Sequence, residues 1–147
     1  MLVSREDVLK FIPQRQPIVV VHGLISHSEN TSVSEFNVEE DHLFVRDGKL
    51  LESGLMENIA QTSALRSGYC FSQQMSDKEV MKEPPIGFIG ALKNFVVNNL
   101  PSIGSVLYTT VKVTYEVMGM QVVEANVECD GKVIASCEMK IFLSQEA

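Results

Sequence analysis

The chain has 147 residues, of which 45% are hydrophobic and 21% are charged. This length and apolar content fit a single domain over residues 1–147 and exclude intrinsic disorder. With 12 basic and 19 acidic residues, the net charge is −7, which argues against nucleic acid as the main ligand. No apolar run reaches the ~18 residues of a membrane span, so we expect no membrane insertion.

The start of the chain and its cysteines predict the compartment. Ser4-Arg5-Glu6-Asp7 interrupts the N-terminus too early for a signal peptide. Cys70, Cys129 and Cys137 are an odd number and match no zinc-binding spacing. We therefore expect a cytoplasmic protein whose cysteines are reduced core thiols, with a reactive thiol as the less favoured alternative.

The first third of the chain predicts one short helix and two strands. A capping-box pattern at Ser4 predicts a helix that Pro13 ends. A run of β-branched residues predicts a strand over Ile18–Ile25. Imperfect alternation predicts a second strand over Ser32–Val38, before a polar, irregular segment over 39–51.

One long helix is predicted in the middle of the chain. Apolar residues recur at helical spacing from Gly54 to about Gln74, after Ser53 as the capping residue. Glu57 and Arg66 are the only charged residues in this stretch. We expect a helix with so little charge to be almost surrounded by other elements.

The last part of the chain changes to the period of strands. Before it, the polar segment Met75–Pro85 is interpreted as a loop, with a lid as the alternative. The predicted strands are Ile86–Val97, Ser105–Val117, Val122–Cys129 and Lys132–Leu143. Their short connections, among them an Asp130-Gly131 hairpin turn, favour antiparallel pairing of neighbours. The pattern predicts an α+β fold with a sheet curled around the long helix.

Two titratable residues are candidates for catalysis, because phosphate-binding glycine loops, HExxH motifs and CxxC pairs are absent from the sequence. Glu57 is either a helix-start acid that interacts with the dipole or a carboxyl kept protonated by apolar surroundings as a general acid. His42 is either an exposed loop residue or a general base. His22 and His27 are interpreted as structural or solvent-facing.

Three stretches together carry a family resemblance. They are Phe11–Val21 with its two prolines, Met56–Thr62 with its Glu and Gln, and Ile86–Gly90. Their order and spacing resemble the β-hydroxyacyl-acyl-carrier-protein dehydratases of the hotdog fold, from roughly Phe11 to Leu143. The family's His-Phe-Pro-Gly turn is here His42-Leu43-Phe44-Val45, and its Pro-Gly at the helix start is Leu51-Glu52. These departures suggest a divergent branch, such as the dehydratases that accompany pigment-type polyene synthases.

The resemblance implies a fold and a reaction. It implies a hotdog fold in which His42 removes the α-proton of a 3-hydroxyacyl thioester and Glu57 protonates the leaving hydroxyl. The product is a trans-2-enoyl thioester, and neither a metal nor a redox cofactor is expected. Backbone amides at the helix start, Gly54 or Leu55, are expected to polarise the carbonyl. The expected substrate-binding residues are Gly54, Leu55, Met56, Phe88, Ile89 and Gly90.

The resemblance also implies partners. The acyl group is expected on acyl carrier protein or coenzyme A, since the basic residues are too scattered to favour one carrier. A homodimer joined at the sheet edges, or an oligomer of such dimers, would place His42 of one chain opposite Glu57 of the other. A hotdog acyl-thioesterase and a non-catalytic acyl-binding or partner subunit remain as alternatives.

Overall fold

The computed structural model describes residues 1–74 and 87–143, so the loop or lid expected at Met75–Pro85 lies outside the described residues. Its elements are the 3-10 helix η1 (Val8–Lys10), helix α1 (Glu52–Gln74) and strands β1 (Gly23–His27), β2 (Thr31–Asn37), β3 (Val45–Arg46), β4 (Lys49–Leu50), β5 (Gly87–Val97), β6 (Val106–Val117), β7 (Met120–Cys129) and β8 (Lys132–Leu143).

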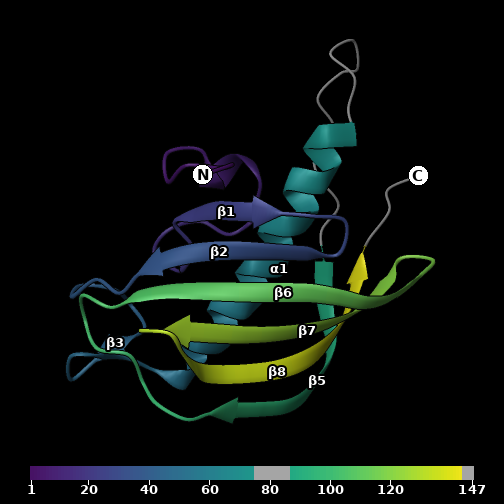
Figure 1. The fold of residues 1–147 in the computed structure, drawn as a ribbon. Coiled ribbons are helices and arrows are strands. Elements are labelled where there is room, and N and C mark those ends of the chain that lie inside the picture. The colour runs from purple at the N-terminus through teal and green to yellow at the C-terminus, as the bar shows by residue number, and fades with distance from the viewer. Residues whose placement is uncertain (75–86, 144–147) are drawn as a thin grey trace.

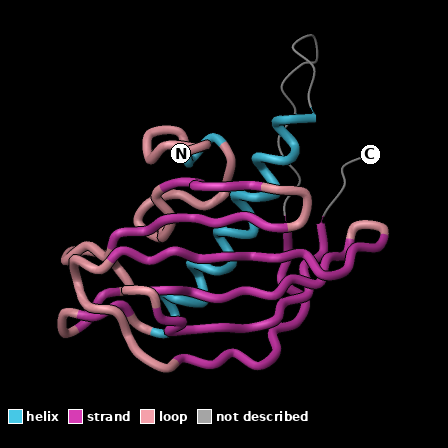
Figure 2. Tube along the Cα trace, viewed as in Figure 1, coloured by secondary structure: helices cyan, strands magenta, loops and turns pink. Residues whose placement is uncertain are grey.

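One antiparallel sheet curls around α1. Its six strands are in the order β1-β2-β6-β7-β8-β5, and β3 and β4 form a separate small hairpin. Figures 1 and 2 show the strands crossing in front of the long helix, with the N-terminal segment beside β1. The α+β class and the curled sheet are therefore as the sequence predicted.

Helix α1 is buried along most of its length. It begins at Glu52, slightly earlier than expected, and even its charged residue Arg66 is only 7% exposed. A Cβ at Gly68 would collide with the carbonyl oxygen of Phe11, so the N-terminal segment packs directly on the helix backbone. Within residues 1–74 and 87–143, no helix is long and apolar enough to cross a membrane.

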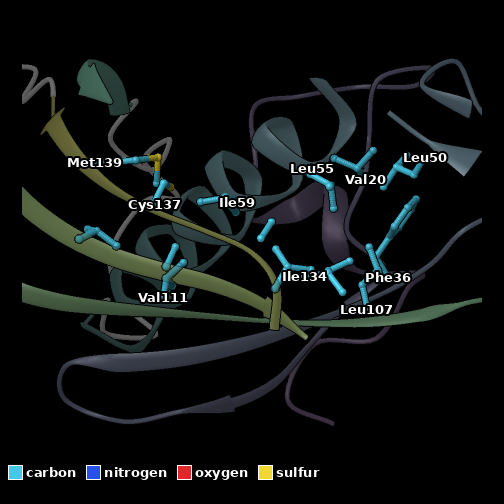
Figure 3. Packing of buried hydrophobic residues seen from close by; sticks show 14 of the residues in the cluster. Val20, Phe36, Leu50, Leu55, Ile59, Leu107, Val111, Ile134, Cys137 and Met139 are labelled. Carbon is cyan, nitrogen blue, oxygen red and sulfur yellow. The ribbon is translucent and has the colours of Figure 1, made fainter. Parts of the chain in front are cut away.

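The main core lies between α1 and the concave face of the sheet (Figure 3). Alternate residues of β6 show the expected period of two, because Leu107 and Val111 are fully buried while Tyr108 is 42% exposed. Leu55 and Ile59 of α1 meet this face and are also fully buried. The apolar pattern of the sequence thus orients both the helix and the sheet.

The expected pairing of the last four strands is wrong at β5. This strand pairs with β8 instead of β6, and β6 pairs with β2. The connection 98–105 is held against the small β3–β4 hairpin, where the amide of Leu50 donates to Pro101 O and the amide of Ile103 donates to Gly48 O. It therefore carries the chain past the helix start instead of turning back tightly on β5.

Two expectations for the N-terminal part are also wrong. The helix predicted from Ser4 is only the 3-10 turn η1, because the Ser4 hydroxyl bonds the Asp7 carboxylate instead of a backbone amide. The strand predicted over Ile18–Ile25 begins only at Gly23. Residues 18–20 hydrogen-bond instead to side chains of α1. These bonds occupy the backbone N–H and C=O groups that a neighbouring strand would need.

Candidate active site

Residues 18–20 lie against α1 and are held by two of its side chains. The side-chain oxygen of Gln61 accepts the Val20 amide at 2.7 Å, and its Nε2 donates to Ile18 O at 2.8 Å. Asn58 Nδ2 donates to Val20 O at 2.8 Å, and both side chains are fully buried. The helix segment that carries Glu57 is thus joined to this part of the backbone.

Glu57 is half-buried beside Gln61. Its Oε1 accepts a hydrogen bond from Gln61 Nε2 at 3.1 Å. Among the described residues, Oε2 receives no hydrogen bond, so this oxygen is the one available to a ligand or a proton. Gln61 therefore orients the carboxyl and leaves one of its oxygens free.

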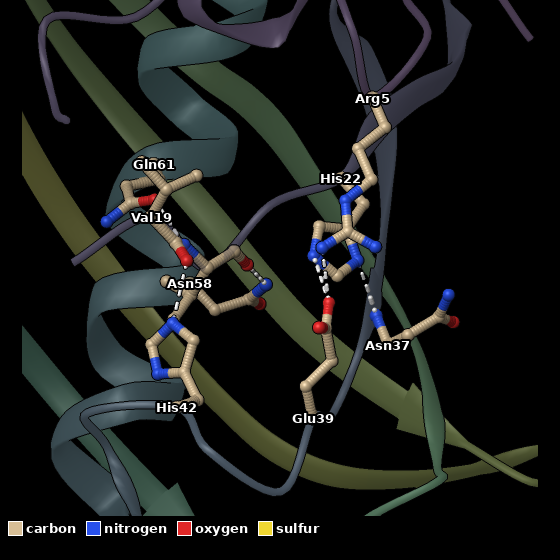
Figure 4. A network of polar contacts seen from close by, with 9 residues as sticks. Arg5, Val19, His22, Asn37, Glu39, His42, Asn58 and Gln61 are labelled. Atoms are coloured by element: carbon tan, nitrogen blue, oxygen red, sulfur yellow. Dashed lines mark hydrogen bonds and ion pairs between the residues drawn. The ribbon is translucent and has the colours of Figure 1, made fainter. Parts of the chain in front are cut away.

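His42 is half-buried in the loop between β2 and β3, with its ring against Phe36 and Phe44. Its Nε2 lies 2.8 Å from Val19 O, and the amide of Phe44 donates to its Nδ1 at 3.1 Å. Because a backbone amide can only donate, Nδ1 is the acceptor and Nε2 carries the proton of the neutral ring. Figure 4 shows the imidazole pointing at the Val19 carbonyl.

The two predicted catalytic residues reach the same short segment of backbone. His42 bonds Val19 O, and Gln61 links Glu57 to the adjacent Ile18 O. Within one chain, His42 and Glu57 make no hydrogen bond to each other. A pair acting on one substrate therefore has to be completed by the substrate or by a second chain.

The amides expected to polarise a carbonyl are already used. Those of Gly54 and Leu55 both donate to Leu51 O, at 2.9 Å and 3.1 Å, and the Leu55 side chain is fully buried. The described part of the chain offers no acceptor to the amides of Glu52 and Ser53, because α1 begins at Glu52. The backbone amides that could polarise a carbonyl therefore lie nearer the N-terminal end of α1 than predicted.

The other predicted substrate-binding residues lie on surfaces. Met56 is 36% exposed on α1, and Phe88 and Ile89 are 59% and 46% exposed at the start of β5. Gly90 is covered by the ring of Phe142, which a Cβ at this position would strike. In the described residues β5 pairs only with β8, so its other edge is open.

The sequence interpretation missed a polar cluster around His22, which is only 8% exposed. Its Nδ1 accepts the Asn37 amide at 3.1 Å, and its Nε2 lies 3.1 Å from Glu39 Oε1, which also accepts from Arg5. Burial is the largest cause that lowers the pKa of His22 to about 4; Arg5 and His42 also lower it, and Glu39 raises it. His22 is therefore neutral and donates its Nε2 proton to Glu39.

We expect this histidine to make stability depend on pH. The pKa of His22 is about 4 in the folded chain against 6.5 as its ordinary value, so the unfolded chain binds the proton first as pH falls. The contribution is present above pH 6.5 and is lost toward pH 4, with a cost on the order of 2 kcal/mol at pH 4.5. Urea unfolding at pH 7.5 and 4.5 measures it.

The matched variant for that measurement is His22→Gln, whose amide can accept from Asn37 and donate to Glu39 without titrating. We expect its free energy of unfolding to change less between the two pH values than that of the wild type. Equal losses in both proteins would assign the pH dependence to other groups.

Cys70 forms a pair with His27, but the pair does not activate the thiol. Arg66 Nη1 lies 3.3 Å from His27 Nδ1 and can only donate, so Nδ1 is an acceptor. His27 Nε2 therefore carries the proton and donates it to Cys70 Sγ, 3.4 Å away. Burial raises the pKa of Cys70 and lowers that of His27. The three cysteines are free thiols, and burial raises the pKa of Cys137 to about 11.

Comparison with known proteins identifies the fold. A chain of the dehydratase heterocomplex ApeI:P from Xenorhabdus doucetiae is 19% identical with a TM-score of 0.81, and the match covers 95% of this chain and 91% of that one. The PaaI protein of the E. coli phenylacetic acid degradation operon is 15% identical (TM-score 0.62, 81% and 80% covered). A hypothetical thioesterase of Streptococcus pneumoniae, solved with coenzyme A, is 11% identical (TM-score 0.64, 84% and 85% covered). These likenesses confirm the hotdog fold.

The family is identified by a separate comparison with protein-family models. No curated protein matches the chain. The model described as "ApeP dehydratase" matches residues 6–147, which is almost the entire sequence. This agrees with the dehydratase resemblance that the sequence motifs carry. The chain therefore belongs to the ApeP-like dehydratase family.

Proposed function

We propose that the protein dehydrates 3-hydroxyacyl thioesters to trans-2-enoyl thioesters, with His42 as the base and Glu57 as the acid. The observation that carries the proposal is a half-buried histidine and a half-buried carboxyl, whose Oε2 receives no hydrogen bond from the described residues, in a chain from a dehydratase family. Such a pair is what elimination of water next to a thioester carbonyl requires.

The proposed reaction uses one atom of each side chain, Nδ1 of His42 and Oε2 of Glu57. His42 Nδ1 has the lone pair, so it takes the proton from C2 once the substrate has displaced the Phe44 amide. Glu57, protonated on Oε2, gives its proton to the 3-hydroxyl as the C3–O bond breaks. The C2–H electrons form the double bond, and the hydroxyl leaves as water.

The thioester carbonyl needs donors while charge develops on it. The amides of Glu52 and Ser53 meet no acceptor among residues 1–74 and 87–143, and they lie at the positive end of the α1 dipole. We place the carbonyl there instead of at Gly54 and Leu55, whose amides bond Leu51 O. Met56, Phe88 and Ile89 then remain candidates for contact with the acyl chain, because their side chains are exposed.

We infer that the site is completed in a homodimer through the open edge of β5. Phe88, Ile89 and Val96 on this strand are 46% to 59% exposed, and pairing with a second β5 would cover an unpaired strand edge. His42 of one chain would then face Glu57 of the other. This explains why the two residues do not bond each other within one chain.

Acyl carrier protein is the proposed carrier, with coenzyme A as the alternative. Carrier proteins are acidic, so a docking surface should be basic. Arg46 and Lys49 are exposed and directly opposite each other on the hairpin that precedes α1. The free thiols fit a cytoplasmic site of action, where such carriers work.

A non-catalytic partner subunit is the second candidate. Both ring nitrogens of His42 are hydrogen-bonded, as in a purely structural histidine. The similar Xenorhabdus doucetiae chain comes from a dehydratase heterocomplex. By analogy, the partner of a non-catalytic chain would be a different dehydratase chain.

One assay separates these functions. The purified protein is incubated with 3-hydroxyacyl thioesters on acyl carrier protein and on coenzyme A, and products are followed by mass spectrometry. We expect loss of one water with the thioester intact, and the preferred carrier identifies the partner. Release of free acid would indicate a thioesterase. Binding without turnover would indicate the partner subunit and contradict our proposal.

A further inference from the structure

The loop 38–44, which carries His42, is fixed to the rest of the fold at its root. The amide of Val38 donates to Ser105 O at 2.9 Å, and the amide of Gly104 donates back to Val38 O at 2.8 Å. Beyond this point the loop turns, with the His42 amide 3.3 Å from Glu39 O. Glu39 thus lies in the chain between the fixed root and His42, and its carbonyl oxygen faces the His42 amide.

The Glu39 carboxylate is held from two sides through a single oxygen. Oε1 accepts from Arg5 Nη2 and from His22 Nε2, the latter at 3.1 Å. The Asn37 amide occupies His22 Nδ1, so the imidazole can present only its Nε2 proton to Glu39. The direction of this hydrogen bond is therefore fixed by the backbone of β2.

The segment 18–22 holds the same loop at two points. His22 bonds Glu39, and three residues earlier Val19 O accepts from His42 (Figure 4). The fully buried ring of Phe36 contacts both imidazoles, with ring centroids 4.6 Å from His22 and 5.7 Å from His42. The loop is thus bonded to two residues of the segment 18–22, and the Phe36 ring packs against both imidazoles.

We propose that Glu39 is a positioning residue for His42, acting through His22 and Arg5. The inference rests on the proposed function, in which His42 is the base. The contact with Arg5 is solvent-exposed and adds little alone. The bond from buried His22 supplies most of the constraint on the Glu39 side of the loop. On the other side, the loop is held by the bond from His42 to Val19 O and by the Leu51 amide, which donates to Phe44 O at 2.9 Å.

The test compares Glu39→Ala with Glu39→Gln. Both existing bonds go to Oε1, so the single oxygen of glutamine can accept both of them, whereas alanine accepts neither. With the dehydration substrate, we expect Glu39→Ala to lower kcat by about 10- to 100-fold at nearly unchanged KM, since misplaced groups lose rate more than binding. Glu39→Gln should restore most of kcat.

A second measurement makes the test independent of turnover. Ring-nitrogen NMR signals of His42 report its hydrogen bonds to Val19 O and Phe44, and we expect them to shift in Glu39→Ala and stay near wild type in Glu39→Gln. The matched control is Glu40→Ala, which removes an exposed neighbouring charge and should leave both kcat and these signals unchanged.

The outcomes are distinguishable from failure of the proposed function. Wild-type kcat and unshifted His42 signals in folded Glu39→Ala would overturn the positioning role while dehydration stands. An equal effect of Glu40→Ala would also overturn it, because loss of charge would then be the cause. If the wild type dehydrates nothing, the proposed function fails, and the NMR comparison alone decides whether Glu39 positions His42.

Discussion

Replacing Glu57 by glutamine is expected to lower kcat for dehydration by about 10²- to 10⁴-fold, the usual contribution of a positioned proton donor. The variant is nearly isosteric, and its side-chain oxygen can still accept the 3.1 Å bond from Gln61. What it loses is the carboxyl proton that the leaving hydroxyl needs. Water loss from the preferred thioester, followed by mass spectrometry in single-turnover and steady-state assays, measures the effect.

The control for this prediction is Glu128→Gln, which removes a carboxylate from an exposed position of β7 and should retain wild-type turnover. His42→Ala should lose activity to a similar extent, and the double variant should be hardly worse than either single one, because the two residues act as a unit. Dehydration that survives in folded Glu57→Gln would remove Glu57 from the mechanism. Activity retained in His42→Ala would leave another base to be found.

The parts of the fold that the sequence predicts are those specified by local patterns. Helical periodicity places α1 to within a few residues, and strand alternation identifies β6, β7 and β8. At the predicted hairpin, Asp130 and Gly131 both have positive φ, at 52° and 76°, as a type I′ turn requires. Each of these features depends on neighbours in the chain.

The parts that the sequence does not predict depend on distant partners. The β-branched run before Gly23 has strand propensity, but its hydrogen bonds come from Asn58 and Gln61, some 40 residues later. A strand at Ile18 would need a neighbour that the curled sheet does not offer there. Similarly, β5 is recognisable as a strand, but its place beside β8 depends on how the connection 98–105 passes the helix start.

The same distinction applies to the candidate site. Glu57 and His42 are suggested by residue type and by the family motif, whereas the amides of Gly54 and Leu55 are ruled out as free donors only by their bonds to Leu51 O. His22 could not be singled out, since its importance comes from burial and from Asn37 and Glu39 on either side of it. The sequence thus proposes candidate groups by their chemistry, and their hydrogen-bond partners come only from the fold.

Truncating Phe36 to alanine should have the largest effect on stability, lowering the free energy of unfolding by about 3–5 kcal/mol. The ring is fully buried between α1 and the sheet, and it also supports the imidazoles of His22 and His42. Such a loss is a large fraction of the roughly 5–15 kcal/mol that holds a domain of ordinary stability together. Urea unfolding at pH 7.5, monitored by circular dichroism, measures it.

Phe36→Leu separates the two roles of the ring. Leucine keeps most of the buried volume, so we expect a loss of less than about 1.5 kcal/mol. Leucine does not provide the flat ring against which the His42 imidazole packs edge-on. We therefore expect kcat to fall clearly even though the free energy of unfolding changes little. If kcat of Phe36→Leu matches the wild type, the ring serves packing alone, and His42 is held by Val19 O, Phe44 and the Glu39 contacts without it.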